Sequence, residues 1–156
     1  MKKLIAALLL GTALLAPIGA QARDVTISTQ LANYSGPNAY LAIYLTAADG
    51  SYETTLWVAG GRSRYYRDLS GWYRGIAQAG GNIDGITGAS VGSGQTLTVT
   101  TDIADTLIDA GFDIRVDAAV EHIGSYASDA VAPLSTSAPG EAVAGKSIVK
   151  SLTVSM

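Results

Sequence analysis

The stretch 39-AYLAIYLTAADGSYETTLWV-58 decides the fold. Two runs rich in aromatic and branched apolar residues, 39–46 and 52–58, are separated by the letters ADGS at 48–51. Asp-Gly between two such runs is a strong signal for two antiparallel strands joined by a tight turn. We therefore predict a β-hairpin here.

Further strands are predicted on both sides of this hairpin. Apolar and polar residues alternate at 25–30, 95–101, 112–120 and 147–154, and in 112–120 the alternating partners include charged residues. Segment 127–145 is rich in Ala, Ser, Pro and Gly, which indicates an edge strand and a mobile loop. Strands at this spacing with Gly-rich turns predict an all-β fold, an antiparallel β-sandwich of immunoglobulin-like type.

One short helical segment is expected within this sandwich. Leu69, Trp72, Tyr73 and Ile76 recur at helical spacing, which predicts a helix across 68–79. Segment 102–111 fits either a second short helix or a long hairpin connection. A small α+β domain, with 103–110 helical as well, is therefore the alternative fold.

The N-terminus has the pattern of an export signal. Lys2 and Lys3 precede an apolar run at 4–15, and Ala20-Gln21-Ala22 provides a small-x-small cleavage site. We expect residues 1–22 to be a cleaved signal peptide and residues 23–156 to be a single periplasmic domain. The apolar run is short for a membrane span and no later run is longer, so no transmembrane segment is expected in the mature chain.

Charge and composition narrow the classes of function. Only Lys2 and Lys3 of the ten basic residues lie in the signal. The mature chain therefore has eight basic and thirteen acidic residues, and its formal charge is about −5. This balance argues against binding to nucleic acid or to anionic membrane surfaces. The chain has no cysteine and a single histidine, His122. We predict no disulfide, no attachment site for c-type haem, and no zinc or copper site.

An aromatic and basic segment follows the hairpin. Four arginines within 62–74 interleave with aromatic residues that include Trp72 and Tyr73. Cationic groups beside aromatic rings suit the phosphate and ring of FMN. In the other interpretation, which is favoured for most of these residues, the aromatics close one end of the core and the arginines are solvated. His122, likewise, is either a haem or metal ligand or a residue at a strand end.

The segment 84-DGITGAS-90 carries the chemical hypothesis. It resembles D-x-x-[ST]-G-A-[ST], the acceptor motif of periplasmic flavin transferases, which move FMN from FAD onto a Ser or Thr hydroxyl. The resemblance implies that Ser90 accepts a phosphoester-linked FMN, with Asp84, Thr87, Gly88 and Ala89 as the rest of the motif. A Gly-rich loop between two strands is the plainer interpretation.

The residue types suit an acceptor loop. A serine hydroxyl is a weak nucleophile, so the transferase would supply Mg²⁺ and a base while this chain supplies the loop. Gly88 and Ala89 leave room for an enzyme to approach the backbone, and Asp84 is a candidate for an Asx-turn that orders the loop.

Several stretches resemble the exported domain-of-unknown-function family 2271. The resemblance rests on YLAIYLTAADGSYETTLWV, GWYRG, DGITGAS and VEHIGSY, and it covers most of residues 24–154. Members are often encoded near flavin transferases and PepSY-type membrane proteins. The family loop more often ends in Thr and is soon followed by Pro, whereas Val91-Gly92-Ser93-Gly94 follows Ser90 here.

The resemblance implies a periplasmic flavin carrier that exchanges electrons with membrane redox partners such as a PepSY-type protein. A stand-alone enzyme is less favoured, because no carboxylate pair or catalytic dyad can be assembled from the sequence. The alternative function is a non-catalytic binding or structural β-sandwich without cofactor.

Overall fold

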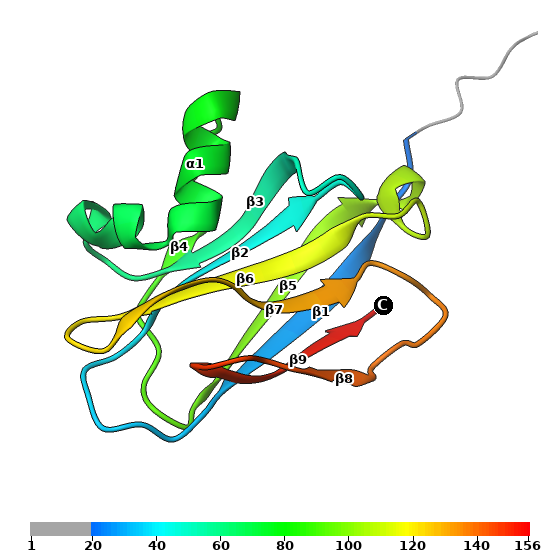
Figure 1. Cartoon of the computed structure of the whole chain (residues 1–156). Helices are drawn as coiled ribbons and strands as arrows, with labels where there is room; N and C mark the ends of the chain where they lie inside the picture. Colours follow the sequence, from blue (N-terminus) through cyan, green and yellow to red (C-terminus); the bar gives the residue numbers. More distant parts are fainter. Residues whose placement is uncertain (1–19) are drawn as a thin grey trace, which may run out of the picture.

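The computed structural model describes residues 20–156, so most of the expected signal peptide lies outside the described residues. Two β-sheets pack face to face (Figure 1). The first sheet contains, in order, β5 (Thr96–Ala104), β1 (Ala22–Leu31), β9 (Val149–Ser155) and β8 (Ala142–Ala144). The second contains β4 (Thr87–Gly88), β3 (Tyr52–Ala59), β2 (Tyr40–Thr46), β6 (Asp113–Val120) and β7 (Gly124–Pro133). The predicted all-β sandwich is confirmed.

The space between the two sheets holds the main hydrophobic core. Alternate residues of each strand point into it, including Ile27 of β1, Ile43 of β2, Val116 of β6 and Leu152 of β9, all fully buried. The period-two patterns in the sequence therefore place their apolar residues inward, as expected for strands with one face in a core.

The second sheet is covered on its outer face as well. A 3₁₀ helix, η1 (Ser63–Asp68), and the helix α1 (Ser70–Ala79) lie across it (Figure 1). They form a second apolar cluster around Trp72, with Tyr44 and Ala42 contributed by β2. Because β2 is buried on both faces, its sequence is a continuous apolar run, as in strands covered on both sides. The predicted helix across 68–79 is confirmed.

The alternative α+β fold is not observed. Strand β5 continues to Ala104, and only a short 3₁₀ helix, η2 (Asp105–Leu107), follows before the chain turns into β6. Segment 102–111 is thus a strand end and a connection between the two sheets. The edge strand expected within 127–145 is β8, while β7 extends further into this segment than the composition indicated.

A buried carboxylate joins the second sheet to α1. Asp117 is fully buried at a β-bulge between β6 and β7. Its Oδ1 accepts hydrogen bonds from the Tyr44 hydroxyl at 2.9 Å and the Ser128 backbone N–H at 2.7 Å. Its Oδ2 accepts the Trp72 backbone N–H, in the first turn of α1, at 2.8 Å. The expectation that the charged residues of 112–120 alternate outward is therefore wrong for Asp117.

Replacement of Asp117 tests this junction. Asp117→Ala leaves three buried donors without their acceptor, so we expect the free energy of unfolding to fall by about 3–5 kcal/mol. Urea unfolding monitored by tryptophan emission measures it, with a red shift as the environment of Trp72 opens. The control is Asp102→Ala, which removes an exposed carboxylate that faces Asp24 across β1 and β5. An equal loss of unfolding free energy in both variants would contradict the role of Asp117 as the acceptor at this junction.

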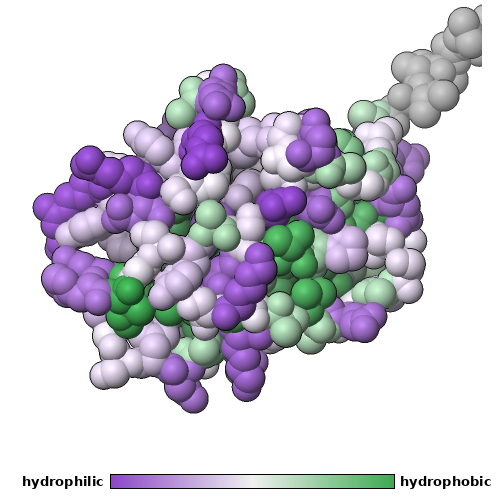
Figure 2. Space-filling model, in the orientation of Figure 1, coloured by the Kyte–Doolittle hydropathy of each residue, from purple (hydrophilic) through white to green (hydrophobic). Residues whose placement is uncertain are grey.

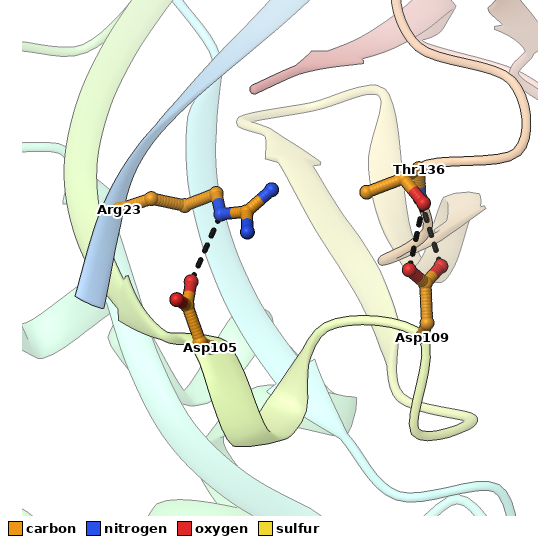
Figure 3. A network of polar contacts seen from close by, with 4 residues as sticks. All are labelled: Arg23, Asp105, Asp109 and Thr136. Atoms are coloured by element: carbon orange, nitrogen blue, oxygen red, sulfur yellow. Dashed lines mark hydrogen bonds and ion pairs between the residues drawn. The ribbon is translucent and has the colours of Figure 1, made fainter. Parts of the chain in front are cut away.

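Polar contacts hold the connection around η2 against β1 and against the segment after β7 (Figure 3). Arg23 Nε donates to Asp105 Oδ1 at 2.9 Å. Asp109, whose φ is 58°, accepts from the Thr136 hydroxyl at 2.7 Å and from the Thr136 backbone N–H at 2.8 Å. The hydrogen bonds from Thr136 and Ser135 lower the pKa of Asp109.

Asp109 makes stability depend on pH. A carboxylate with a lowered pKa in the folded state stabilises the fold above its unfolded pKa, near 4, and this stabilisation is lost as the pH falls through the folded pKa. We expect Asp109→Asn to lower the melting temperature at pH 7 and to make it fall less between pH 4 and pH 2. Parallel acid titration curves for the variant and the wild type would contradict this.

Candidate functional site

The motif loop begins where α1 ends. Gly80 adopts a left-handed conformation, with φ 70°, and stops the helix. After the turn at 83–86, the two residues of β4 pair in parallel with β3, Thr87 opposite Val58. The Val58 N–H donates to the Ile86 carbonyl at 2.9 Å, and the Gly60 N–H donates to the Gly88 carbonyl at 2.8 Å. The motif is therefore the edge of the second sheet as well as a loop.

Gly88 is required by packing against a tryptophan. A Cβ atom on Gly88 would lie 2.7 Å from Cζ2 of Trp57, which is closer than side chains approach. Trp57 belongs to β3 and packs against the main core. The glycine of the motif thus lets the loop lie flat on this ring.

The turn within the motif is formed by a residue outside it. Asn82 Oδ1 accepts the backbone N–H of Asp84 at 2.9 Å, and Asn82 Nδ2 donates to Asp84 Oδ2 at 3.0 Å. Asn82 is therefore the residue whose side chain makes the Asx-turn, and Asp84 supplies the backbone N–H that it accepts. The expectation that Asp84 forms the turn is wrong, since its side chain is exposed and bonded back to Asn82.

Ser90 is fixed between two backbone attachments. Gly88 pairs with Ala59 on one side, and on the other Val91 forms an antiparallel bridge with Ala39. The Ala39 N–H donates to the Val91 carbonyl at 2.7 Å, and the Val91 N–H donates to the Ala39 carbonyl at 2.9 Å. Ser90 is half-buried and lines a pocket of about 640 Å³.

Four segments that are distant in the sequence form this pocket, hereafter the Ser90 pocket. They are 37–40 before and at the start of β2, 62–68 in and before η1, Ser90 itself, and 119–125 at the β6–β7 turn. Figure 2 shows a gap in the surface between the hydrophilic η1 segment and this turn. Among the motif residues Ser90 lines the pocket, whereas Asp84, Thr87, Gly88 and Ala89 do not.

Two tyrosines form an aromatic wall of the Ser90 pocket. The rings of Tyr40 and Tyr65 meet edge to face, with centroids 5.4 Å apart and an interplanar angle of 65°. Tyr40 lies over Gly60, where any side chain would overlap its ring. The Arg64 guanidinium lies 4.8 Å from the centroid of the Tyr65 ring and donates to its hydroxyl at 3.0 Å.

Trp72 and Tyr73 have different environments. Trp72 is 1% exposed, and its indole Nε1 donates to Thr55 Oγ1 at 2.8 Å. It is a core residue beneath α1, so the interpretation that the aromatics support the core is correct for Trp72. Tyr73 is 46% exposed, and neither residue lines the Ser90 pocket.

Charged groups of both signs surround the pocket. Arg62 is exposed and forms no ion pair within residues 20–156. Asp68 and Glu121 line the same pocket. His122, in a left-handed conformation with φ 65°, has its Nε2 3.8 Å from Glu121 Oε1. Across the described chain, no three His, Asp or Glu side chains gather as metal ligands would.

Sequence reasoning missed the contribution of Tyr40 and the β6–β7 turn to this site, whereas Arg62 belongs to the basic segment that the sequence offered as a candidate. Tyr40 lies in a run interpreted as a core strand, and the turn carries no motif. One available signal was Gly60-Gly61 before the basic segment, because adjacent glycines often mark a close approach of backbone to a ring. Burial raises the pKa of Tyr66, whose hydroxyl donates to the Gly60 carbonyl at 2.8 Å and holds this approach.

The packing at Gly88 predicts the effect of adding one methyl group. We expect Gly88→Ala to displace β4 from Trp57 and to lower the free energy of unfolding by about 1–3 kcal/mol. The matched control is Gly61→Ala, because nothing lies within 4 Å of a Cβ there and its φ is not in the left-handed region. Thermal unfolding of both variants measures the difference, and equal melting temperatures would contradict the close packing.

Comparison with known proteins adds family membership. Searches of curated proteins and of solved structures find no match. No helix within residues 20–156 is long and apolar enough to cross a membrane. A family model described as a predicted periplasmic protein matches residues 22–151, nearly all of the described chain. The protein therefore belongs to the periplasmic domain-of-unknown-function family 2271 (DUF2271).

Proposed function

We propose that this periplasmic protein carries FMN, bound covalently through a phosphoester to Ser90, and acts as an electron-transfer carrier. The observation that carries the proposal is the position of Ser90. It is the residue that the acceptor motif assigns to attachment, and it is also the motif residue that lines a pocket of about 640 Å³. A Gly-rich surface loop without function gives no reason for this coincidence.

The residues around Ser90 fit the group. A volume of about 640 Å³ lies within the range of ligand pockets in proteins, roughly 300–1,000 Å³. Tyr40 and Tyr65 offer aromatic surface, and Arg62 offers a cation in the same pocket as the Ser90 hydroxyl. Bound there, FMN would supply one- and two-electron transfer, which no cysteine pair in this chain provides.

The chain itself supplies a positioned hydroxyl to which no base is hydrogen-bonded within residues 20–156. Within the described residues, Ser90 forms no side-chain hydrogen bond, and His122 is the single histidine. Attachment would join Ser90 Oγ to the FMN phosphorus of FAD with release of AMP, and the hydroxyl proton would pass to a base of the flavin transferase. The exposed side chains of Asp84, Thr87 and Ala89 are the part of the motif that the transferase would read.

The membrane redox partner follows from the family resemblance and the location. Members of the family are often encoded near PepSY-type membrane proteins, with which a periplasmic flavin carrier would exchange electrons. A PepSY-type protein is the proposed partner. Arg62 lines the Ser90 pocket, and the other exposed arginines of 62–74 belong to the same segment and are available to contact an acidic surface on the partner.

Substitutions at Ser90 test the attachment. After co-expression with a flavin transferase, we expect denaturing electrophoresis under ultraviolet light to show a fluorescent band for the wild type. Ser90→Ala should abolish the band, because the nucleophile is removed, and Ser90→Thr should keep it. Thr87→Ala should reduce the yield about tenfold or less, since Thr87 is read by the transferase without accepting the phosphate.

A known acceptor protein expressed in the same cells is the control for transferase activity. If that protein is labelled while the wild type stays dark, Ser90 is not an acceptor. The fold would then be a periplasmic binding module without covalent cofactor. Intact mass measurement gives the same answer independently, as a single addition of one FMN.

A further inference from the structure

We infer that the Ser90 pocket is a seat for the isoalloxazine ring of a flavin, with Tyr40 and Tyr65 as its aromatic wall and Arg62 as the donor to its polar edge. The choice of a flavin rests on the proposed function. The site does not depend on the attachment motif, because Asp84 to Ala89 do not line the pocket. Tyr40, Tyr65 and Arg62, which lie outside the motif, are the residues that would bind the ring.

The aromatic wall is held in place before any ligand arrives. Tyr40 is confined by Gly60 beneath it, and Tyr65 is fixed by the Arg64 guanidinium over its face and at its hydroxyl. Both side chains are only half-buried, so part of each ring remains open to the pocket. Rigid aromatic side chains bind flat ligands well because little side-chain entropy is lost on binding.

The polar groups match the hydrogen-bonding edge of the ring rather than a free phosphate. The pyrimidine edge of isoalloxazine alternates carbonyl acceptors with an N–H donor. Arg62 supplies donors without a carboxylate partner, and Asp68 and Glu121 supply acceptors in the same pocket. Two carboxylates would oppose a phosphate dianion, whereas a ring edge of both polarities satisfies both signs.

Part of the pocket wall is apolar. Ile123, at the tip of the β6–β7 turn, is 39% exposed, one of the two most exposed large apolar residues among those described. It lines the same pocket, while the other, Tyr73, does not. An exposed isoleucine in a pocket loses contact with water when a ligand binds, and the methylated benzene end of a flavin is the complementary surface.

The test uses the mature protein without attached flavin and riboflavin as the probe. Riboflavin has the ring and lacks the phosphate, so its fluorescence reports on the seat alone. We expect saturable quenching by the wild type, with FMN binding no more than a few-fold tighter. Tyr65→Leu, which keeps apolar volume, should weaken riboflavin binding about tenfold, and Tyr65→Phe should bind as the wild type does.

Arg62→Ala and Arg74→Ala form the matched pair of arginine variants. Both arginines are exposed, but only Arg62 lines the pocket, so only Arg62→Ala should weaken binding, by about five- to tenfold. Melting temperatures confirm that each variant is folded. Absence of saturable riboflavin quenching by folded wild type, or equal weakening by both variants, overturns the ring seat. FMN binding without riboflavin binding also overturns it, in favour of a phosphate site.

The outcomes separate this inference from the attachment itself. Riboflavin binding together with a dark wild-type band supports the seat and contradicts covalent attachment at Ser90. A fluorescent band without riboflavin binding contradicts the seat and leaves the attachment standing. On labelled protein, the seat predicts that iodide quenches the flavin less in the wild type than in Tyr65→Leu.

Discussion

The buried carboxylate of Asp117 determines how the layers of this protein fit together. A charge removed from water costs several kcal/mol unless it is hydrogen-bonded, and here three donors converge on it. The donors come from β2, from the bulged β7 and from the first turn of α1. Asp117 on β6 accepts the Trp72 backbone N–H and Thr55 on β3 accepts the Trp72 indole N–H, so the first turn of α1 is fixed on the sheet at two points. Gly71 belongs to this fit, because a Cβ there would lie 2.8 Å from the Tyr44 hydroxyl and 2.9 Å from Asp117 Oδ2.

The position of α1 in turn determines where the Ser90 pocket forms. η1 immediately precedes α1, and Leu69 between them is fully buried in the cluster around Trp72. The chain from Arg62 to Tyr65 therefore projects from a fixed point on the outer face of the second sheet. The motif loop leaves the other end of α1 and returns along β3. One helix, fastened at its first turn, thus brings the basic segment and the acceptor serine to the same end of the sandwich.

Local pattern was sufficient to predict the elements and insufficient to predict the site. The hairpin at 39–58, the strand at 25–30 and the helix ending at Ala79 were all apparent from spacing and turn residues. Asp117 was not, because alternation places it on the outer face of the second sheet, and the helical layer that covers this face lies outside the strand pattern. The outer layer also buries residues of the face that alternation assigns to water. Burial by a layer from another part of the chain has no signature in the sequence of one strand.

The site combined one predicted residue with several that no local signal marks. Ser90 was singled out by its resemblance to a motif of consecutive residues. Tyr40, Arg62 and the β6–β7 turn meet only through the packing of two sheets and a helix. Asn82, rather than Asp84, makes the Asx-turn, because the Asn82 side chain reaches the backbone N–H two residues further on, at Asp84. Which residue makes this turn depends on the path of the chain as it leaves α1.

The two attachments on either side of Ser90 differ in a way that suits a residue modified by another protein. Val91 and Ala39 are buried and bridged twice, so the chain after Ser90 stays with the sandwich. Before Ser90, the motif is held at a sheet edge by the two hydrogen bonds to β3, a net stabilisation of about 2 kcal/mol. Local opening takes place where few backbone bonds and little apolar burial resist it, so the segment from Asp84 to Ala89 separates first. In the proposed reaction a transferase would bind that segment while Val91 keeps the acceptor on the protein. Re-pairing of β4 with β3 would then return Ser90, with its cofactor, to the mouth of the pocket.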